Sequence, residues 1–473
     1  MKRTPTLIGR AIVAVGICIF PYSGTTYAAE TQPPNILVIL ADDLGYGDIG
    51  CHGGKIPTPN IDSLARGGMS FKEGYVTAPQ CAPSRAGLLT GRYQEKFGFE
   101  YNLDTPEPFT EHAGCLPLGE RTMADYLHAS GYHTGIIGKW HLGLEPQFHP
   151  LQRGFDEFFG FLNGGSFYLP PGKAKCIPGI MRNKTPVQVT SYLTEVFGDE
   201  ANSYIERNKE KPWFLYLAFN APHEPWEAPQ KYLDRFPSVA SQQARTYAAM
   251  VSALDDAVGG VLQTLEKLQL KERTIIVFLS DNGAPLHRIP SASNGPLRGE
   301  KGDVLEGGIR VPLIVEWPGH VPAGTQINTP VSALDLMPTF LEIAGKPAAE
   351  DAKLDGQSLL GTLTTGKEPQ GDRALYWLFR LRHPEARHSW GIRQGPWKFW
   401  RGPDSSQRDA GKLLCAKTAL FNIESDIHED KDCSAEQPET RKALEAKLGE
   451  WMKTLQPPRW GDSKGKPAPN VSE

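Results

Sequence analysis

Short, continuous apolar runs recur along the chain and are separated by segments whose apolar residues follow helical spacing. Such runs are typical of strands that are buried on both faces of a parallel sheet. Four runs are predicted to be strands, at residues 35–40, 134–137, 213–219 and 274–280. Helices are predicted between them, at residues 58–66, 123–128 and 247–265. Strands that alternate with helices predict an α/β fold with helices on both faces of the sheet.

The pattern changes near residues 366–372, where the chain becomes polar and loop-like. Short aromatic runs follow this segment, and one late helix is predicted at residues 438–455. We therefore predict a catalytic domain over residues 29–365 and a small C-terminal α+β subdomain over residues 366–473. The subdomain is expected to hold a short antiparallel sheet and to end in a disordered tail from Gly461.

The N-terminal residues have the order of a secretory signal peptide. Lys2 and Arg3 come first, an apolar run occupies residues 11–20, and small residues follow as far as Ala28. We predict cleavage after Ala28, so that residues 1–28 are removed and the mature protein is periplasmic or secreted. The apolar run is too short to span a bilayer as a mature helix, so an integral membrane protein is not expected. An uncleaved anchor is the alternative interpretation.

Composition narrows the possible functions only in part. The 473 residues carry 50 basic and 54 acidic side chains, a formal net charge of −4 that leaves no basic footprint for nucleic acid. The apolar content of 40% is ordinary for a globular protein. Six cysteines follow the predicted signal peptide, too few for a disulfide scaffold in a chain of this length, and none has the spacing of a zinc site.

Acidic side chains follow two of the predicted strands. Asp42 and Asp43 come after the first strand, and Asp281 and Asn282 come after the fourth. Ligands of open α/β sheets bind beyond the carboxyl ends of the strands, so these side chains are expected to lie together. Carboxylate and amide oxygens suit Ca²⁺ or Mg²⁺ rather than zinc. The simpler alternative is that both pairs are helix caps or turn residues.

Basic and imidazole side chains follow the other two strands. The second strand leads to Lys139 and His141, the third leads to His223, and Lys301 lies in a glycine-flanked loop. Lone lysines are mostly surface residues, and lone histidines are usually surface or satisfied core residues. Gathered at strand ends, these side chains predict a cleft for a tetrahedral anion, the group that phosphoryl or sulfuryl transfer must stabilise.

Cys81 lies in the run Cys81-Ala-Pro-Ser-Arg85, where Pro83 is placed to open a helix. The cysteine is then near the positive end of the helix dipole, which favours a reactive thiolate. A lone cysteine is as often a packing residue, so Cys81 taken by itself leaves both interpretations open.

The run from Cys81 to Arg85 resembles the Cys-x-Pro-Ser-Arg motif of the type I sulfatases. Residues 131–143 resemble the second motif of that family. Further segments stand in family order, at residues 42–48, 58–62, 281–283, 306–312 and 333–339. The resemblance is close over residues 34–346, and residues 146–160 are similar to the N-acetylgalactosamine-6-sulfatase and arylsulfatase A branch. It implies the alkaline-phosphatase-like α/β sandwich, with a mostly parallel central sheet flanked by helices and a small C-terminal subdomain.

The resemblance also implies a modified nucleophile and a divalent cation. In the family, a maturation enzyme oxidises the motif cysteine, here Cys81, to Cα-formylglycine before folding. The hydrated aldehyde offers two hydroxyls, one to attack sulfur and one to eliminate sulfate afterwards. The implied cation is Ca²⁺, with Mg²⁺ as the alternative. Its implied ligands are Asp42, Asp43, Asp281, Asn282 and residue 81.

The same resemblance implies roles for the basic side chains. Arg85 and Lys139 are expected to hold the hydrated aldehyde. His141 is expected to take the proton from its second hydroxyl, and His223 to protonate the leaving alcohol. Lys301 is expected to bind the sulfate. The implied activity is that of a sulfuric ester hydrolase.

A sulfated carbohydrate is the expected substrate, because aromatic and basic residues occur together in the segments expected to surround the site. Those segments are residues 97–115, 164–186, 286–298 and 379–401, the last of which carries Arg380 and Trp400. Three alternatives stay open. They are a phosphate or phosphonate ester hydrolase of the same superfamily, a thiol hydrolase that uses Cys81, and a non-catalytic binder of sulfated glycans.

Overall fold

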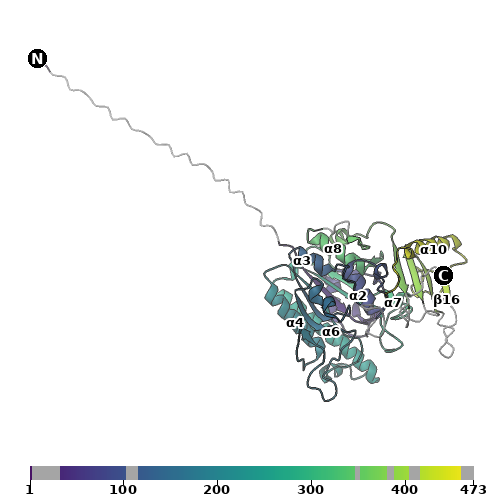
Figure 1. The fold of residues 1–473 in the computed structure, drawn as a ribbon, viewed down its shortest axis with the longest axis horizontal. Coiled ribbons are helices and arrows are strands. Elements are labelled where there is room, and N and C mark those ends of the chain that lie inside the picture. Colours follow the sequence, from purple (N-terminus) through teal and green to yellow (C-terminus); the bar gives the residue numbers. More distant parts are fainter. Residues whose placement is uncertain (3–31, 103–114, 347–351, 381–387, 404–415, 460–473) are drawn as a thin grey trace. The chain divides into compact units, whose positions relative to one another are not determined.

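The computed structural model describes residues 1–2, 32–102, 115–346, 352–380, 388–403 and 416–459. Residues 33–473 form one compact unit (Figure 1). The predicted signal peptide, apart from its first two residues, and the predicted C-terminal tail lie outside the described residues. No helix within the described ranges combines the length and the apolar character that crossing a membrane requires.

A ten-stranded sheet forms the centre of this unit. Four parallel strands stand side by side in it, namely β9 (Thr274–Ser280), β1 (Asn35–Ala41), β8 (Trp213–Ala218) and β4 (His133–Lys139). These are the four strands predicted from the apolar runs, so that prediction is confirmed. The parallel order continues to β5 (Glu157–Phe161).

Shorter strands complete the sheet at its edges, and most of them break the parallel order. They are β10 (Leu313–Glu316), β2 (Met69–Phe71), β11 (Thr325–Ile327), β6 (Met181–Arg182) and β7 (Thr185–Pro186). β10 is antiparallel to β9, and β6 is antiparallel to β5. A separate two-stranded sheet pairs β3 (Gly74–Tyr75) with β12 (Val331–Ser332). The central sheet is therefore mostly, though not entirely, parallel.

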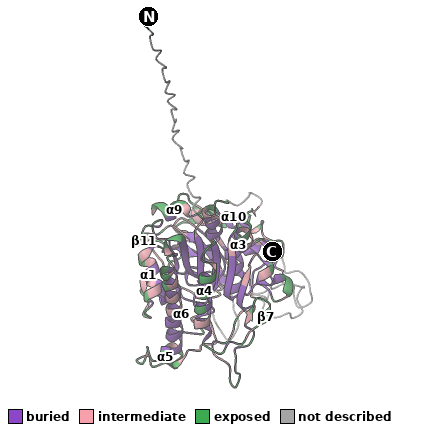
Figure 2. Cartoon of the chain, turned by 90° about the vertical axis from the view of Figure 1, so that its left-hand side faces the viewer, coloured by how far each residue is buried: buried purple, intermediate pink, exposed green. Residues whose placement is uncertain are grey.

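Both faces of the sheet are buried, as Figure 2 shows by the colour of the strands. Along β1, Leu37 and Ile39 enter one apolar core, while Ile36 and Val38 enter the other. This alternation explains why the strand is apolar at every position. The helices of the first core are α1 (Pro59–Gly67), α4 (Leu193–Asn208) and α6 (Gln242–Lys267). Those of the second are α2 (Cys81–Thr90), α3 (Met123–Ala129), α8 (Leu336–Ile343) and α9 (Leu360–Thr365).

The predicted helices are found, with one shifted start. Helix α6 begins at Gln242 rather than at Tyr247, because the Ser241 side chain accepts a hydrogen bond from Ala244 N and caps it. Two further α-helices are short: α5 (Gln230–Leu233) and α7 (Glu306–Ile309). Single turns of 3₁₀-helix lie at Tyr46–Asp48, Gly50–His52, Gln94–Phe97, Pro146–Phe148, Pro150–Gln152, Lys271–Arg273 and Ala333–Asp335.

The C-terminal region forms a four-stranded antiparallel sheet. Its strands are β13 (Ala374–Phe379), β14 (Ser389–Gln394), β15 (Trp397–Pro403) and β16 (Ala416–Asn422). Helix α10 (Pro438–Met452) packs Leu448 and Trp451 against one face. The other face packs Trp377 and Phe421 against Val304 and Ile309, in and around α7. The expected small C-terminal sheet is confirmed, whereas the domain boundary at residue 365 stays a prediction.

Candidate active site

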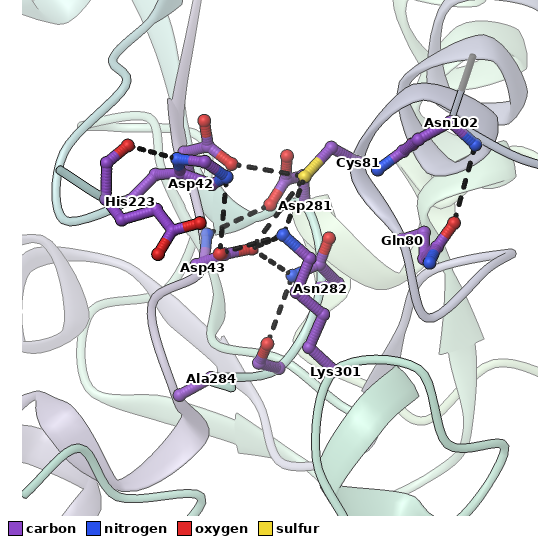
Figure 3. A network of polar contacts seen from close by, with 12 residues as sticks. Asp42, Asp43, Gln80, Cys81, Asn102, His223, Asp281, Asn282, Ala284 and Lys301 are labelled. Atoms are coloured by element: carbon purple, nitrogen blue, oxygen red, sulfur yellow. Dashed lines mark hydrogen bonds and ion pairs between the residues drawn. The ribbon is translucent and has the colours of Figure 1, made fainter. Parts of the chain in front are cut away.

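The acidic residues that follow β1 and β9 meet at the carboxyl ends of these neighbouring strands (Figure 3). Asp43 N donates a hydrogen bond of 3.1 Å to Asp281 Oδ1. Asn282 Nδ2 donates one of 2.6 Å to Asp43 Oδ1. All four side chains, including that of Asp42, are buried. Residues almost 240 positions apart in the chain therefore form one polar cluster.

Cys81 is the first residue of α2 and points into this cluster. Its thiol lies 3.4 Å from Asp42 Oδ1 and 3.8 Å from Asp43 Oδ1. The side chain is 1% exposed, so it is buried within the cluster. Asp42, Asp43, Cys81 and His223 each place one ligand-type atom within 4.8 Å of the others.

Three cationic side chains neutralise the three carboxylates of the cluster. Lys139 Nζ donates to Asp42 Oδ2 at 2.7 Å, and Arg85 Nε donates to Asp281 Oδ2 at 2.9 Å. Lys301 Nζ lies 2.8 Å from Asp43 and 3.3 Å from Cys81 Sγ. Arg85 and Lys139 are fully buried, whereas the Lys301 side chain is 16% exposed. Charges removed from water in this way need such pairing to be tolerated.

Burial and neighbouring charges shift the pKa values of the cluster in different directions. Burial alone would raise the pKa of Asp42, but Lys139 and other cations hold it well below its usual range. Burial raises the pKa of Asp281 to about 6, with help from the charge of Asp42. Burial, reinforced by Asp281, also raises the pKa of the Cys81 thiol well above its usual range.

The two histidines lie at the ends of β8 and β4. His223 Nε2 is 3.7 Å from Asp43 Oδ2, and its Nδ1 donates to Glu224 O at 2.6 Å. Nε2 is therefore the nitrogen free to exchange a proton at the site. Burial lowers the pKa of His223 although Asp42 and Asp43 raise it. His141 is buried two residues beyond β4, with its backbone N donating to Leu162 O at 3.0 Å.

Two of the site residues have a strained backbone. Asp43 has a φ of 63° and His141 a φ of 60°, values in the left-handed region that non-glycine residues rarely adopt. Each such residue costs on the order of 1 to 3 kcal/mol and is commonly kept where function needs the geometry. Beside Lys139, Gly138 has a φ of 110°, and a Cβ there would lie 1.9 Å from Ala218 O. Only glycine fits this position.

A cavity of about 150 Å³ opens from the cluster. Asp43, His223 and Lys301 contribute to its wall, and Figure 3 shows these three side chains directed toward one another. The other lining residues are Gln80, Pro222, Glu224, Trp226, Tyr247, Pro285, His287, Arg288 and Ile289. An ion pair between Arg288 and Glu224 joins two of the loops around the cavity.

The segments expected around the site differ in how closely they approach the cavity. Residues 286–298 supply His287 and Arg288 to the cavity wall. Residues 164–186 approach it at Gly165, where a Cβ would lie 3.8 Å from the His223 ring. Residues 379–401 do not line it within their described part. There Trp400 is buried, and Arg380 is buried in an ion pair with Glu100.

Sequence reasoning did not single out several side chains at or beside the site, among them Asn102, Tyr216 and Trp226. Asn102 accepts a hydrogen bond of 2.9 Å from Ala82 N, and so satisfies a donor in the first turn of α2. Tyr216 interacts electrostatically with Arg85 from the middle of β8. Trp226 presents an aromatic face to the cavity. Only Trp226 carried a signal, as a large aromatic residue in the loop just after His223.

The cluster fits a hard divalent cation. Its donors are carboxylate oxygens and an amide, the ligand types that Ca²⁺ and Mg²⁺ prefer. Asn282 Oδ1 is buried and has no hydrogen-bond partner among the described residues. A buried polar atom without a partner is costly, and coordination of a cation would remove that cost. Asp281 is not among the residues whose ligand atoms lie within 4.8 Å of one another, and so lies at the margin of the set.

Comparison with known proteins decides the family. The sequence model described as "Sulfatase" matches residues 34–346. The chain belongs to the sulfatase family. It is a type I sulfatase of the alkaline phosphatase superfamily and a sulfuric ester hydrolase. A second model, described as "N-sulphoglucosamine sulphohydrolase, C-terminal", matches residues 300–451 of this sulfatase.

Individual relatives agree with that placement. Human N-acetylgalactosamine-6-sulfatase is 38% identical over 368 residues, which cover 73% of this chain and 68% of the relative. Human arylsulfatase A is 34% identical over 422 residues, which cover 83% and 80%. Among solved structures, Ps i-CgsB in complex with k-i-k-neocarrahexaose has a TM-score of 0.82 at 38% identity. That superposition covers 91% of this sulfatase and 95% of the other chain.

Proposed function

We propose that this sulfatase hydrolyses the sulfate esters of a carbohydrate, using Cys81 after its conversion to Cα-formylglycine together with a bound Ca²⁺. The observation that carries the proposal is the place of Cys81 at the start of α2, between Asp42 and Lys301. A carbohydrate is favoured because one relative is named for N-acetylgalactosamine-6-sulfate hydrolysis and another was solved with a neocarrahexaose.

Two groups supply the chemistry that the twenty ordinary side chains lack. Hydrated formylglycine at position 81 would supply two hydroxyls on one carbon, one as the nucleophile and one for the release of sulfate. Asp42, Asp43, Asp281, Asn282 and residue 81 would hold the cation, which would supply a Lewis acid. Ca²⁺ is favoured over Mg²⁺ because several protein donors converge here from different loops, whereas Mg²⁺ is usually held by one or two carboxylates and keeps several waters.

The chain's own basic residues orient residue 81, transfer protons and bind the sulfate. Arg85 and Lys139, fully buried beside Asp281 and Asp42, hold the substituents of residue 81 in one orientation. His223 Nδ1 donates a hydrogen bond to Glu224 O, and its Nε2 protonates the leaving alcohol. Lys301, on the cavity wall, binds the sulfate. His141 takes the proton released when sulfate is eliminated.

The structure argues against two of the competing functions and leaves the third to be tested. A thiol hydrolase needs a thiolate, yet burial and Asp281 raise the pKa of the Cys81 thiol. A non-catalytic binder gives no purpose to the strained backbone at Asp43 and His141. A phosphate ester hydrolase shares the same geometry, since both esters present a tetrahedral anion. Only substrate turnover separates it from a sulfatase active on sulfate alone.

Mass spectrometry of the peptide that contains residue 81 tests the nucleophile directly. Formylglycine makes that peptide about 18 Da lighter than the cysteine form, a mass change set by the modification itself. The same preparation should hydrolyse an aryl sulfate and a galactose-derived sulfate faster than the matched phosphates. Full sulfatase activity from a preparation with only unmodified thiol would contradict the proposal.

Export and maturation belong to the same proposal. We propose that residues 1–28 direct the chain to the periplasm or out of the cell. A formylglycine-generating enzyme is then the partner that acts on Cys81. N-terminal sequencing of protein recovered from each cell fraction tests the first point, and detection of an intact Lys2 on exported protein would refute it.

A further inference from the structure

Lys301 lies in a loop that has little regular structure of its own. The segment of residues 298–306 runs from the loop after β9 to the first residue of α7. Near the lysine, Lys301 N donates to Ala284 O at 3.2 Å and Gly302 N donates to Pro79 O at 2.9 Å. No strand or helix holds the segment until α7, so the position of the Lys301 ammonium depends on these hydrogen bonds and on how the two ends are held.

Both ends of the segment are bound to one residue of the C-terminal region, Glu429. At the far end, Glu306 N donates to Glu429 Oε2 at 2.8 Å. At the near end, Arg298 Nη1 donates to Glu429 O at 2.7 Å. The ends also meet each other, since Gly307 N donates to Arg298 O at 2.6 Å. Glu429 thus closes the segment into a loop with Lys301 at its tip.

Glu429 is itself fixed by a buried lysine of the C-terminal sheet. Lys398, on β15, lies with its Nζ 2.8 Å from Glu429 Oε1 and 2.9 Å from Glu306 Oε1. The side chains of all three residues are 0% exposed. Tyr75 OH adds a hydrogen bond of 2.6 Å to Glu306 Oε2. A cation shared by two buried carboxylates in this way is stable only while all the partners stay in place.

Helix α7, which begins at Glu306, also supports the backbone after the site residue Asn282. Gly283, which follows Asn282, donates its N–H to Gly308 O at 3.1 Å. A Cβ on Gly283 would lie 1.8 Å from Gly307 O, so the backbone after Asn282 rests directly on α7. Figure 1 shows α7 beside the strands of the C-terminal sheet. Helix α7 therefore joins that sheet to two segments that carry site residues.

We infer that Glu429 and Lys398 are positioning residues of the active site, which make the C-terminal sheet a fixed support for the Lys301 segment. The inference rests on the proposed role of Lys301 in binding the sulfate. It gives a purpose to the motif at residues 306–312, whose first residue is the shared anchor. It also gives a region that does not line the cavity within its described part a role in the geometry of the cavity wall.

A double-mutant cycle tests the inference. Glu429→Gln keeps the shape of the side chain and removes its charge, and Lys301→Ala removes the ammonium. We expect Glu429→Gln to lower kcat/KM for an aryl sulfate by about tenfold, and to cause a change below about twofold when Lys301 is already alanine. Inhibition by inorganic sulfate should weaken in parallel in both single variants. An equal loss in both backgrounds would show a merely structural role and overturn the inference.

Arg298→Met supplies a second variant that should fold whatever happens to the buried pair, because Arg298 is only partly buried. It releases the near end of the segment from Glu429 O, and its effect on kcat/KM should depend on Lys301 in the same way as that of Glu429→Gln. Arg373→Gln is the matched control. Arg373 ties the C-terminal sheet to Asp335 by an ion pair that involves none of residues 298–306. Its kcat/KM should stay within about twofold of the parent value.

Hydrogen–deuterium exchange separates a failure of this inference from a failure of the proposed function. Peptides that cover residues 298–306 should exchange faster in Glu429→Gln and Arg298→Met than in Arg373→Gln. Equal exchange in all three variants would overturn the positioning role, even in a protein that hydrolyses sulfates normally. Faster exchange in a protein that never hydrolyses a sulfate ester would uphold the structural link and refute the proposed function instead.

Discussion

Two buried ionic clusters lie on either side of the Lys301 segment, and they have the same charge composition. The site cluster is Asp42, Asp43, Asp281, Arg85, Lys139 and Lys301. The support cluster is Glu73, Glu306, Glu429, Arg310, Arg393 and Lys398. Each contains three carboxylates and three cations. Buried charge alone therefore does not distinguish a reactive centre from a structural one.

The difference lies in what surrounds the charges. The support cluster is enclosed by the apolar contacts of Trp377 and Val304 and by the Tyr75 hydroxyl. The site cluster borders a cavity, includes a thiol, and leaves Asn282 Oδ1 without a partner among the described residues. Unused bonding capacity beside a cavity is thus the better sign of function. The predictions below test that distinction.

Cys81→Ser should have the largest effect. A serine hydroxyl can still attack sulfur, but its sulfate ester has no second hydroxyl with which to eliminate sulfate. Turnover should stop after one event and leave protein heavier by about 80 Da, the mass of a transferred SO₃ group. Burst kinetics and intact-protein mass spectrometry measure both effects. Cys51→Ser, at a partly buried thiol outside the site, is the control, and repeated turnover by Cys81→Ser at a near-native rate would contradict the mechanism.

Removal of the divalent cation should lower activity by at least about 100-fold, because the Lewis acid and the orientation it imposes are lost together. Ca²⁺ should restore the rate, and Mg²⁺ should restore it less well. Activity is measured after chelation and dialysis, with metal content followed by elemental analysis. Full activity in protein shown to be free of metal would place the site cluster in the same class as the support cluster.

Replacing His223 by Gln should slow hydrolysis according to the leaving group. A sugar alcohol needs protonation as it leaves, so its sulfate should react about 100-fold more slowly. A nitrophenol leaves as a stable anion, so its sulfate should lose less than about threefold by the same argument. Steady-state kinetics on the two esters decide the matter. Equal losses would assign His223 a role in binding rather than in proton transfer.

Replacing a charged residue should cost more stability in the support cluster than in the site cluster. Glu306→Gln leaves the fully buried Lys398 short of one partner, and should lower the free energy of unfolding by about 3 to 5 kcal/mol. Lys301→Met leaves Asp43 beside a cavity where water can solvate it, and should cost less than about 1.5 kcal/mol. Urea unfolding measures both. A larger loss for Lys301→Met would remove the distinction between the clusters.

The sequence predicted the centre of the fold and the members of the site cluster better than their surroundings. Continuous apolar runs such as residues 35–40 can be stable only with both faces covered, so they predict central parallel strands. Residues directly after such strands must share one edge of the sheet, which brought Asp43 and Asp281 together. The support cluster carries no such signal. Lys398 and Glu306 are 92 positions apart, and nothing local in either segment specifies the other.

The central place of β1, between β8 and β9, also limits the time during which Cys81 is accessible in the growing chain. The sheet cannot close over Cys81 until β9 has been made, and β9 begins only at Thr274. At about 5 to 20 residues per second, the intervening stretch of about 190 residues takes roughly 10 to 40 s to synthesise. After that closure the cysteine is 1% exposed at the start of a packed helix. An enzyme that modifies Cys81 must therefore work within this interval or act on a chain kept unfolded.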